Sequence, residues 1–152
     1  MREAEEMKTI ALRFSNSFAP DCGTIQSHQA LIEQNGYVWY GKLGTKVSTG
    51  IADTILKNDN PRILLIHSGA SQRYWASIDK IEYSIPPLLE IPEYYRDRAA
   101  EFKTWFRVQS FILAPKNILS HCVVASSGVS LSHASRHSMS PYFIIETDSY
   151  YS

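Results

Sequence analysis

The chain has 152 residues, 44% hydrophobic and 20% charged, which fits one globular domain and excludes a disordered or fibrous protein. Its 15 basic and 15 acidic side chains give a formal net charge of zero, so it lacks the broad positive field that drives tight non-specific binding to phosphate backbones. No stretch approaches the roughly 20 apolar residues of a membrane-spanning helix, and the charged start MREAEEMKT lacks the apolar core of a signal peptide, so we expect a cytoplasmic protein without membrane contact.

Short apolar or aromatic runs bounded by turn residues predict the strands. These lie at residues 9–16, 37–42, 62–68, 73–84, 103–113 and 121–125. Apolar residues at helical spacing and capping signals predict helices at 24–35, 48–57 and 93–102, and a single helical turn at 115–119. Thr24 is the expected N-cap of the first helix and Gly36 its C-terminal cap. The PYFIIE run at 141–146 fits either a helix start or an edge strand.

The predicted strands follow one another as hairpins with short helices inserted, and they do not alternate regularly with helices. This order predicts an α+β fold, a small, curved, mostly antiparallel β-barrel flanked by short helices. We expect a single domain over residues 9–147, with a flexible leader at 1–8 and a tail at 148–152.

Familiar catalytic and cofactor motifs are missing from the sequence, among them GxGxxG, Walker A, HExxH and GxSxG. We therefore assign no catalytic residue and expect no cofactor. Cys22 and Cys122 lie far apart without a CxxC pair, which predicts two free thiols and no zinc finger. His133 and His137 stand four residues apart, as two metal ligands on one helical face would. The surrounding sequence has little helical periodicity and no third ligand nearby, so it predicts no metal site.

Aromatic residues concentrate on three of the predicted strands, and strand pairing would bring several of them to one end of a barrel. Such rings can stack on a flat base, which is worth roughly 1–3 kcal/mol per base, or they can fill the core. The sequence leaves both roles open. The residues are Trp39, Tyr40, Tyr74, Trp75, Trp105 and Phe106.

The order of these parts resembles the PUA-like superfamily, and within it the EVE and YTH branches, small β-barrels that bind modified bases. The run ILLIHSGASQRYWASIDKI at 63–81 is similar to the EVE hairpin, in which an apolar strand ends in a His-Ser pair. WFRVQSFILAPKNIL at 105–119 resembles the family's strand that ends at a proline, and SRHSMS at 135–140 its late Ser-Arg segment. The usual EVE opening strand is missing and an extra helix is inserted, so the resemblance leaves the ligand open.

The resemblance implies recognition of a flipped or single-stranded base, methylated or not, in an aromatic pocket. Trp39 would stack on the base, with His67 and Ser68 at the floor of the slot and Arg136 at its rim. The expected base-binding set is Trp39, Tyr40, His67, Ser68, Trp75 and Trp105. The expected phosphate contacts are Lys42, Arg73 and Arg136. The expected partner is a nucleic acid or a modified nucleotide, and a partner protein would supply any effector activity.

Two other function classes stay open. One is an enzyme of the related ASCH branch, in which Lys42 or Lys46 would act with Glu82 on a nucleoside or RNA. The other is a protein-interaction module without a small ligand. An open aromatic slot would favour the base-binding module, a buried lysine–glutamate pair the enzyme, and a filled barrel mouth the interaction module.

Overall fold

The computed structural model describes residues 6–14, 23–67, 72–138, 140 and 142–148. The strands are β1 (Glu6–Phe14), β2 (Val38–Leu43), β3 (Arg62–His67), β4 (Arg73–Glu82), β5 (Phe102–Leu113), β6 (Cys122–Val124) and β7 (Tyr142–Asp148). The α-helices are α1 (Thr24–Asn35), α2 (Thr49–Leu56), α3 (Glu93–Arg96) and α4 (Leu131–His137), and the 3-10 turns are η1 (Leu88–Glu90), η2 (Ala99–Glu101) and η3 (Ile118–His121).

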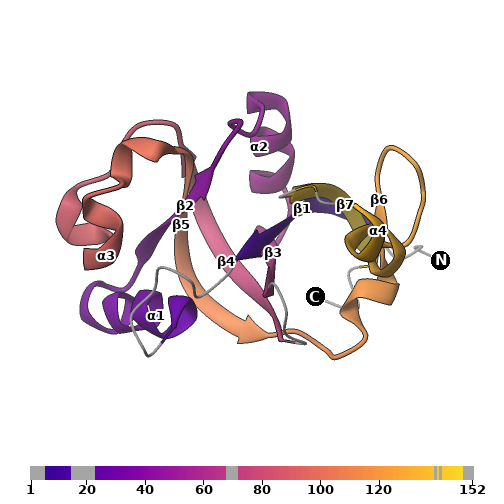
Figure 1. The fold of residues 1–152 in the computed structure, drawn as a ribbon, viewed down its shortest axis with the longest axis horizontal. Helices are drawn as coiled ribbons and strands as arrows, with labels where there is room; N and C mark the ends of the chain where they lie inside the picture. The colour runs from indigo at the N-terminus through magenta and orange to yellow at the C-terminus, as the bar shows by residue number, and fades with distance from the viewer. Residues whose placement is uncertain (1–5, 15–22, 68–71, 139, 141, 149–152) are drawn as a thin grey trace.

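The seven strands form one sheet in the order β2-β5-β4-β3-β1-β7-β6. Every neighbouring pair is antiparallel except β1 and β3, which run parallel. The sheet curls into a half-barrel, with the helices arranged around it (Figure 1). This arrangement confirms the predicted α+β fold with one curved, mostly antiparallel sheet.

Local sequence signals explain where the first two helices begin and end. Gly36 has a φ of 86° and donates its N–H to the Ile32 carbonyl at 2.7 Å, so it is the predicted left-handed cap of α1. The N-cap of α1 is Gly23, whereas the sequence predicted Thr24, which is buried as the first helical residue. The Ser48 hydroxyl accepts from the backbone N–H of Ile51 and caps α2.

Three segments differ from the prediction. The run expected to be a helix start or an edge strand is β7, which pairs with β1 on one side and β6 on the other. The helix expected at 93–102 is only α3 followed by the η2 turn. Helix α4 was not predicted, because Leu131 and Ala134 are its only apolar residues; the Ser130 hydroxyl caps it by accepting from the N–H of His133.

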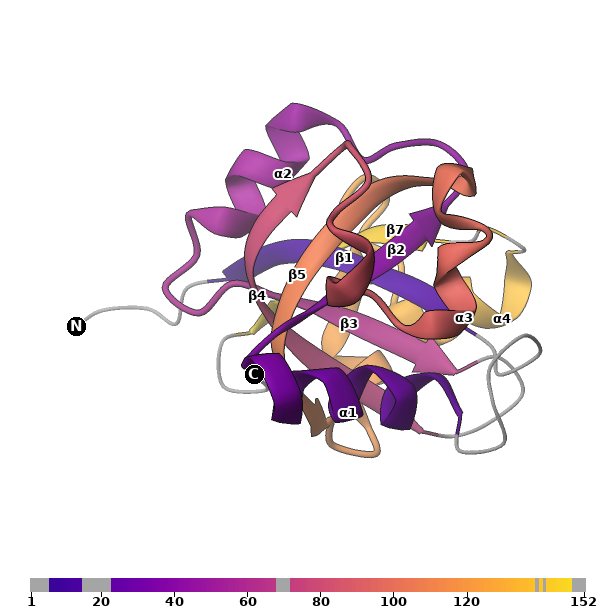
Figure 2. The ribbon, with the colours of Figure 1, turned by 90° about the vertical axis from the view of Figure 1, so that its left-hand side faces the viewer.

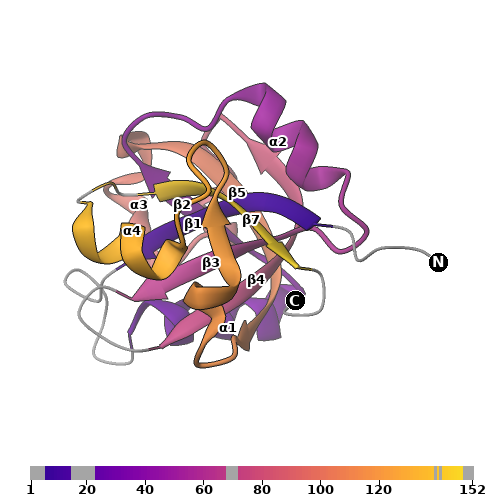
Figure 3. The same ribbon diagram turned by 90° about the vertical axis from the view of Figure 1, so that its right-hand side faces the viewer.

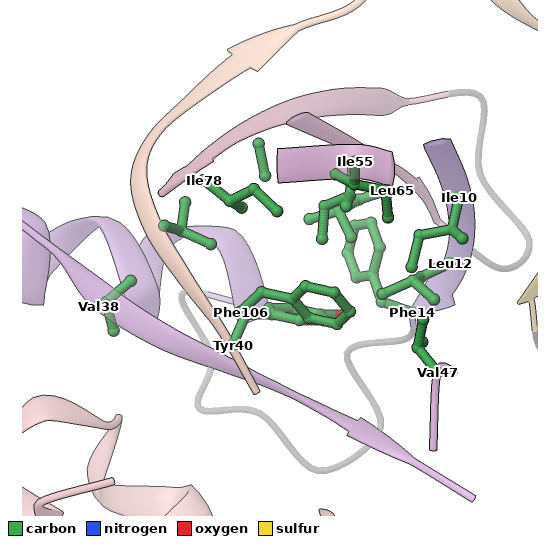
Figure 4. Packing of buried hydrophobic residues seen from close by; sticks show 13 residues of the cluster. Ile10, Leu12, Phe14, Val38, Tyr40, Val47, Ile55, Leu65, Ile78 and Phe106 are labelled. Atoms are coloured by element: carbon green, nitrogen blue, oxygen red, sulfur yellow. The ribbon is translucent and has the colours of Figure 1, made fainter. Parts of the chain in front are cut away.

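Buried side chains form three clusters around the sheet. The first fills the inside of the half-barrel, where Ile10, Leu12, Tyr40 and Phe106 point into the same interior (Figure 4). The second lies on the opposite face of the sheet, under η3 and α4, which flank β6 and β7 (Figure 3). The third cluster lies between the β2–β5 pair and α3.

Helix α1 lies across one end of the half-barrel and α2 across the other (Figure 2). Strand β2 passes so close to β5 that a Cβ at Gly41 would lie 2.6 Å from Cγ of Phe102, so only glycine fits there without a shift. None of the helices in the described residues is long and apolar enough to cross a membrane.

Candidate nucleic-acid interface

Lys42, near the end of β2, and Tyr142, at the start of β7, meet through their side chains. The Lys42 Nζ lies 4.3 Å from the centroid of the Tyr142 ring. An ammonium this close to the face of an aromatic ring is attracted by its electron density. The contact joins two strands that are not hydrogen-bonded neighbours in the sheet, and it fixes the Tyr142 ring.

The Lys42 side chain is only 6% exposed, which is unusual for a lysine. Its Nζ donates hydrogen bonds to the carbonyl oxygens of Leu43, at 3.1 Å, and Thr45. Burial lowers the pKa of its ammonium. Two carbonyls and an aromatic ring already surround Nζ. This lysine is therefore better placed to connect β2 to Tyr142 than to contact a phosphate, the role that the sequence predicted for it.

A pocket of about 460 Å³ opens beside Tyr142. That volume lies within the range of roughly 300–1,000 Å³ typical of small-ligand sites. The pocket combines aromatic rings, two serines and one exposed lysine. Its lining residues are Lys8, Ile51, Val124, Ala125, Ser126, Ser140, Tyr142, Phe143 and Ile144.

Arg13, on β1, holds one wall of the pocket in place. Its Nε donates to the carbonyl of Ser140 at 2.9 Å, and its Nη2 donates to the carbonyls of Ser135, at 2.6 Å, and Ser138, at 2.9 Å. The guanidinium also lies 5.6 Å from the centroid of the Phe143 ring. These contacts fasten the end of α4 and the segment after it to β1, so the serine side of the pocket is organised before any ligand binds.

The amino-acid sequence matches one known protein family. The sequence model of the Pua-like family matches residues 10–144, which is most of the chain. The chain belongs to the Pua-like family. No match was found among curated proteins or among solved structures. Membership of the Pua-like family suggests, in general terms, a module that binds RNA or another nucleic acid; it does not distinguish the EVE or YTH branch.

The aromatic residues proposed from the sequence as one base-binding slot lie in three separate places. Trp39 and Trp105 belong to the third cluster, beside α3, where they are 6% and 0% exposed. Tyr40 lies inside the half-barrel, and Trp75 lies in the second cluster on the opposite face. The single slot is therefore not assembled from these rings, because neighbouring strand residues such as Trp39 and Tyr40 point to opposite faces of a sheet.

The remaining predicted contacts are also dispersed. His67 packs edge-to-face against Phe14, with ring centroids 4.8 Å apart, and Ser68 lies outside the described residues. Arg73 has a buried Nε without a hydrogen-bond partner in the described residues, and it does not line the pocket beside Tyr142. Arg136 is exposed on α4, where its Nε donates to the Ser132 carbonyl at 3.1 Å.

The sequence prediction named none of the residues that line the pocket as site residues, above all not Tyr142, although Ser140 lies in the SRHSMS segment that carries part of the family resemblance. The only signal for Tyr142 was its position at the start of the PYFIIE run, which the sequence could not assign to a strand or a helix. Lys8 and Ser126 carry no motif at all. They come together only because β1, β7 and the turn after β6 are neighbours in the sheet.

The arrangement expected for an ASCH-type enzyme is not formed by the described residues. Neither Lys42 nor Lys46 makes an ion pair with a carboxylate there; the Lys46 Nζ lies 5.0 Å from the centroid of the Tyr83 ring instead. Glu82 is exposed at the end of β4.

The described residues contain no group of three or more histidine, cysteine, aspartate or glutamate side chains that could hold a metal ion. Cys122 is a free, buried cysteine, and burial raises the pKa of its thiol, so it is poorly suited to nucleophilic chemistry. Cys22 lies outside the described residues.

Proposed function

We propose that the chain binds one unpaired nucleobase of a nucleic-acid strand, stacked on Tyr142 in the pocket beside the Lys42–Tyr142 contact. The observation that carries this proposal is the shared residue: Tyr142 lines the pocket and is also held by the Lys42 ammonium. A flat aromatic ring fixed at the wall of a pocket of nucleobase size is what base stacking requires.

The polar lining suits the edge of a base. Ser140 Oγ donates to the Tyr142 carbonyl at 2.7 Å, which leaves its lone pairs free to accept from a base N–H. The Ser126 hydroxyl, on the exposed turn after β6, can either donate or accept. Since the finer resemblance is to the EVE and YTH branches, methylated bases are the first ligands to compare with unmodified ones.

Phosphate contacts would be few. Lys8 lines the pocket, and Arg136 lies on α4, between the pocket segments 124–126 and Ser140 in the chain. A chain with no net charge gains little long-range attraction from a nucleic acid. Each phosphate contact to a single strand changes the slope of log K against log salt by about −0.7, so two contacts predict a shallow slope between about −1 and −2.

Tyr142→Ala should weaken binding to a short single-stranded oligonucleotide about tenfold or more, because loss of one stacking platform costs roughly 1–3 kcal/mol. Fluorescence anisotropy with labelled single-stranded RNA, single-stranded DNA and a duplex of the same sequence would measure it. The wild type should prefer a single strand to the duplex. Arg136→Ala should instead weaken binding to every sequence alike and flatten the salt dependence, since a phosphate contact carries no base information.

Tyr142→Phe is the matched control, because it keeps the ring and the Lys42 contact and should bind within about twofold of the wild type. Tyr142 also packs against the half-barrel core, so the thermal unfolding of each variant must be recorded alongside its affinity. If a folded Tyr142→Ala variant binds single strands as tightly as the wild type, Tyr142 is not the stacking platform and the proposal fails.

A further inference from the structure

We propose that His133 and His137 form an open, exchangeable binding site for a borderline transition-metal ion such as Cu²⁺, Ni²⁺ or Zn²⁺ on the exposed face of α4. The sequence argued against a metal here because the ASRHS context shows little helical periodicity. In the structure this segment is helical, both histidines are exposed, and their rings lie parallel to within 29°, with centroids 4.2 Å apart. The site is separate from the base-binding pocket and does not depend on the proposed function.

The ring separation is compatible with chelation. Imidazole nitrogens bind Zn²⁺ at about 2.0–2.1 Å, so two nitrogens on one ion lie at most about 4.2 Å apart. The two rings are stacked with their centroids 4.2 Å apart, and the lone pairs of their nitrogens lie in the ring planes, so the rings must turn to face a shared ion. Both side chains are exposed, so each ring can rotate about its Cα–Cβ and Cβ–Cγ bonds until one nitrogen of each points to the same ion. The spacing of four residues is the one that places two histidines on the same side of a helix.

The helix that carries the pair is fixed at both ends. Ser130 Oγ accepts from the N–H of His133 at 3.2 Å at the start of α4. At its other end, Arg13 donates to the carbonyls of Ser135 and Ser138. A short isolated helix would be marginal in water, so these contacts are what keep the two histidines in register.

Arg136 is the neighbour of His137 in the chain, and its contacts place it on a neighbouring strip of the helix. Its Nε donates to the Ser132 carbonyl one turn earlier, whereas His133 and His137 each lie one residue further along, about 100° round the helix. This separation reduces the repulsion that a guanidinium would otherwise exert on a bound cation.

The described residues offer no third ligand, so water or another exogenous ligand would complete the coordination. The ion would therefore exchange freely, unlike a structural zinc held by four protein ligands. Imidazole ligands favour Cu²⁺ above Ni²⁺ and Zn²⁺ and have little affinity for Mg²⁺ or Ca²⁺. Binding should weaken as the pH falls, because the imidazoles must be unprotonated to bind.

Titration of the full chain with CuCl2 by calorimetry, with the electron paramagnetic resonance spectrum recorded at one equivalent, would test this site. We expect one Cu²⁺ per chain with a spectrum of two equivalent imidazole nitrogens, weaker binding of Ni²⁺ and Zn²⁺, and none of Mg²⁺. His133→Asn and His137→Asn should each reduce Cu²⁺ affinity at least tenfold. His121→Asn is the matched control and should leave affinity unchanged, since His121 lies on η3 and its Nε2 is 3.0 Å from Asn117 Nδ2.

Asparagine at 133 or 137 replaces an exposed residue and should leave the circular dichroism spectrum and the melting temperature unchanged. The proposal is overturned if His137→Asn binds Cu²⁺ as the wild type does, or if His121→Asn loses as much affinity as the paired histidines. A spectrum with a single nitrogen ligand would overturn it too, because it would show that the two imidazoles do not share the ion.

Discussion

Replacing Trp39 with alanine is expected to lower the free energy of unfolding by about 3–5 kcal/mol, the usual cost of truncating a large buried aromatic side chain. The indole is 6% exposed and packs in the third cluster with Tyr95, Phe102 and Trp105. Its Nε1 also donates to Glu90 Oε1 at 3.0 Å, and alanine would remove that bond. Urea unfolding followed by circular dichroism would measure the difference. An exposed stacking platform would behave differently: affinity would fall while stability stayed the same.

Trp39→Phe separates packing from binding. Phenylalanine keeps most of the buried ring and loses only the bond to Glu90, so the protein should stay folded and bind oligonucleotides like the wild type. Leu89→Ala is the exposed control; with 76% of Leu89 accessible, the change should stay within about 0.5 kcal/mol. If Trp39→Ala costs less than about 1 kcal/mol and Trp39→Phe loses affinity, the indole belongs to the binding site and the pocket beside Tyr142 does not.

Most of the fold could be predicted from the sequence, because its signals are local. Gly36 could end α1 with a left-handed residue, and the short, continuous apolar run of β3, bounded by turn residues, is typical of a buried strand. Helix α4 was missed because its stability comes from elsewhere: Leu131 packs into the second cluster, and Arg13 fastens its end. No periodicity within seven residues can report such distant partners.

The candidate site could not be predicted in the same way. The aromatic residues suggested a slot, but the alternation of a strand already separates Trp39 from Tyr40. The burial of Trp105 depends on α3 and on Trp39 of β2, and Trp39 is distant from it in sequence. The pocket takes its lining from β1, α2, β7 and the turn after β6, and the contact of Lys42 with Tyr142 joins β2 to a strand with which it is not paired. These contacts join residues one hundred positions apart and leave no trace in local composition.

His28, on α1, was also not singled out in the sequence analysis, and it is completely buried. Its ring lies within 5.0–6.5 Å of the Tyr40, Tyr94, Tyr95 and Phe111 rings, centroid to centroid. Its Nδ1 lies 2.8 Å from the Thr24 carbonyl, and since a carbonyl only accepts, Nδ1 carries the proton. Its Nε2 has no hydrogen-bond partner among the described residues. The ring is therefore a neutral imidazole enclosed by aromatic rings from β2, α3 and β5, and no carboxylate of the described residues forms an ion pair with it.

Acidification should destabilise the protein through His28. Burial lowers its pKa from 6.5 to about 4, so between these values the unfolded chain takes up a proton that the folded chain does not. The contribution of the neutral His28 ring to the free energy of unfolding is fully present above pH 6.5 and is lost as the pH falls towards 4. Each pKa unit between the folded and unfolded states is worth about 1.4 kcal/mol, so the whole shift is worth about 3 kcal/mol.

Urea unfolding at pH 7, 6, 5 and 4 would measure this loss for the wild type and for His28→Gln, which cannot titrate. His28→Gln should be less stable than the wild type at pH 7 because it loses ring packing, yet its free energy of unfolding should fall less steeply as the pH is lowered. Parallel pH profiles for the wild type and His28→Gln would mean that His28 is already protonated in the folded state, and the assignment of a buried neutral imidazole would be wrong.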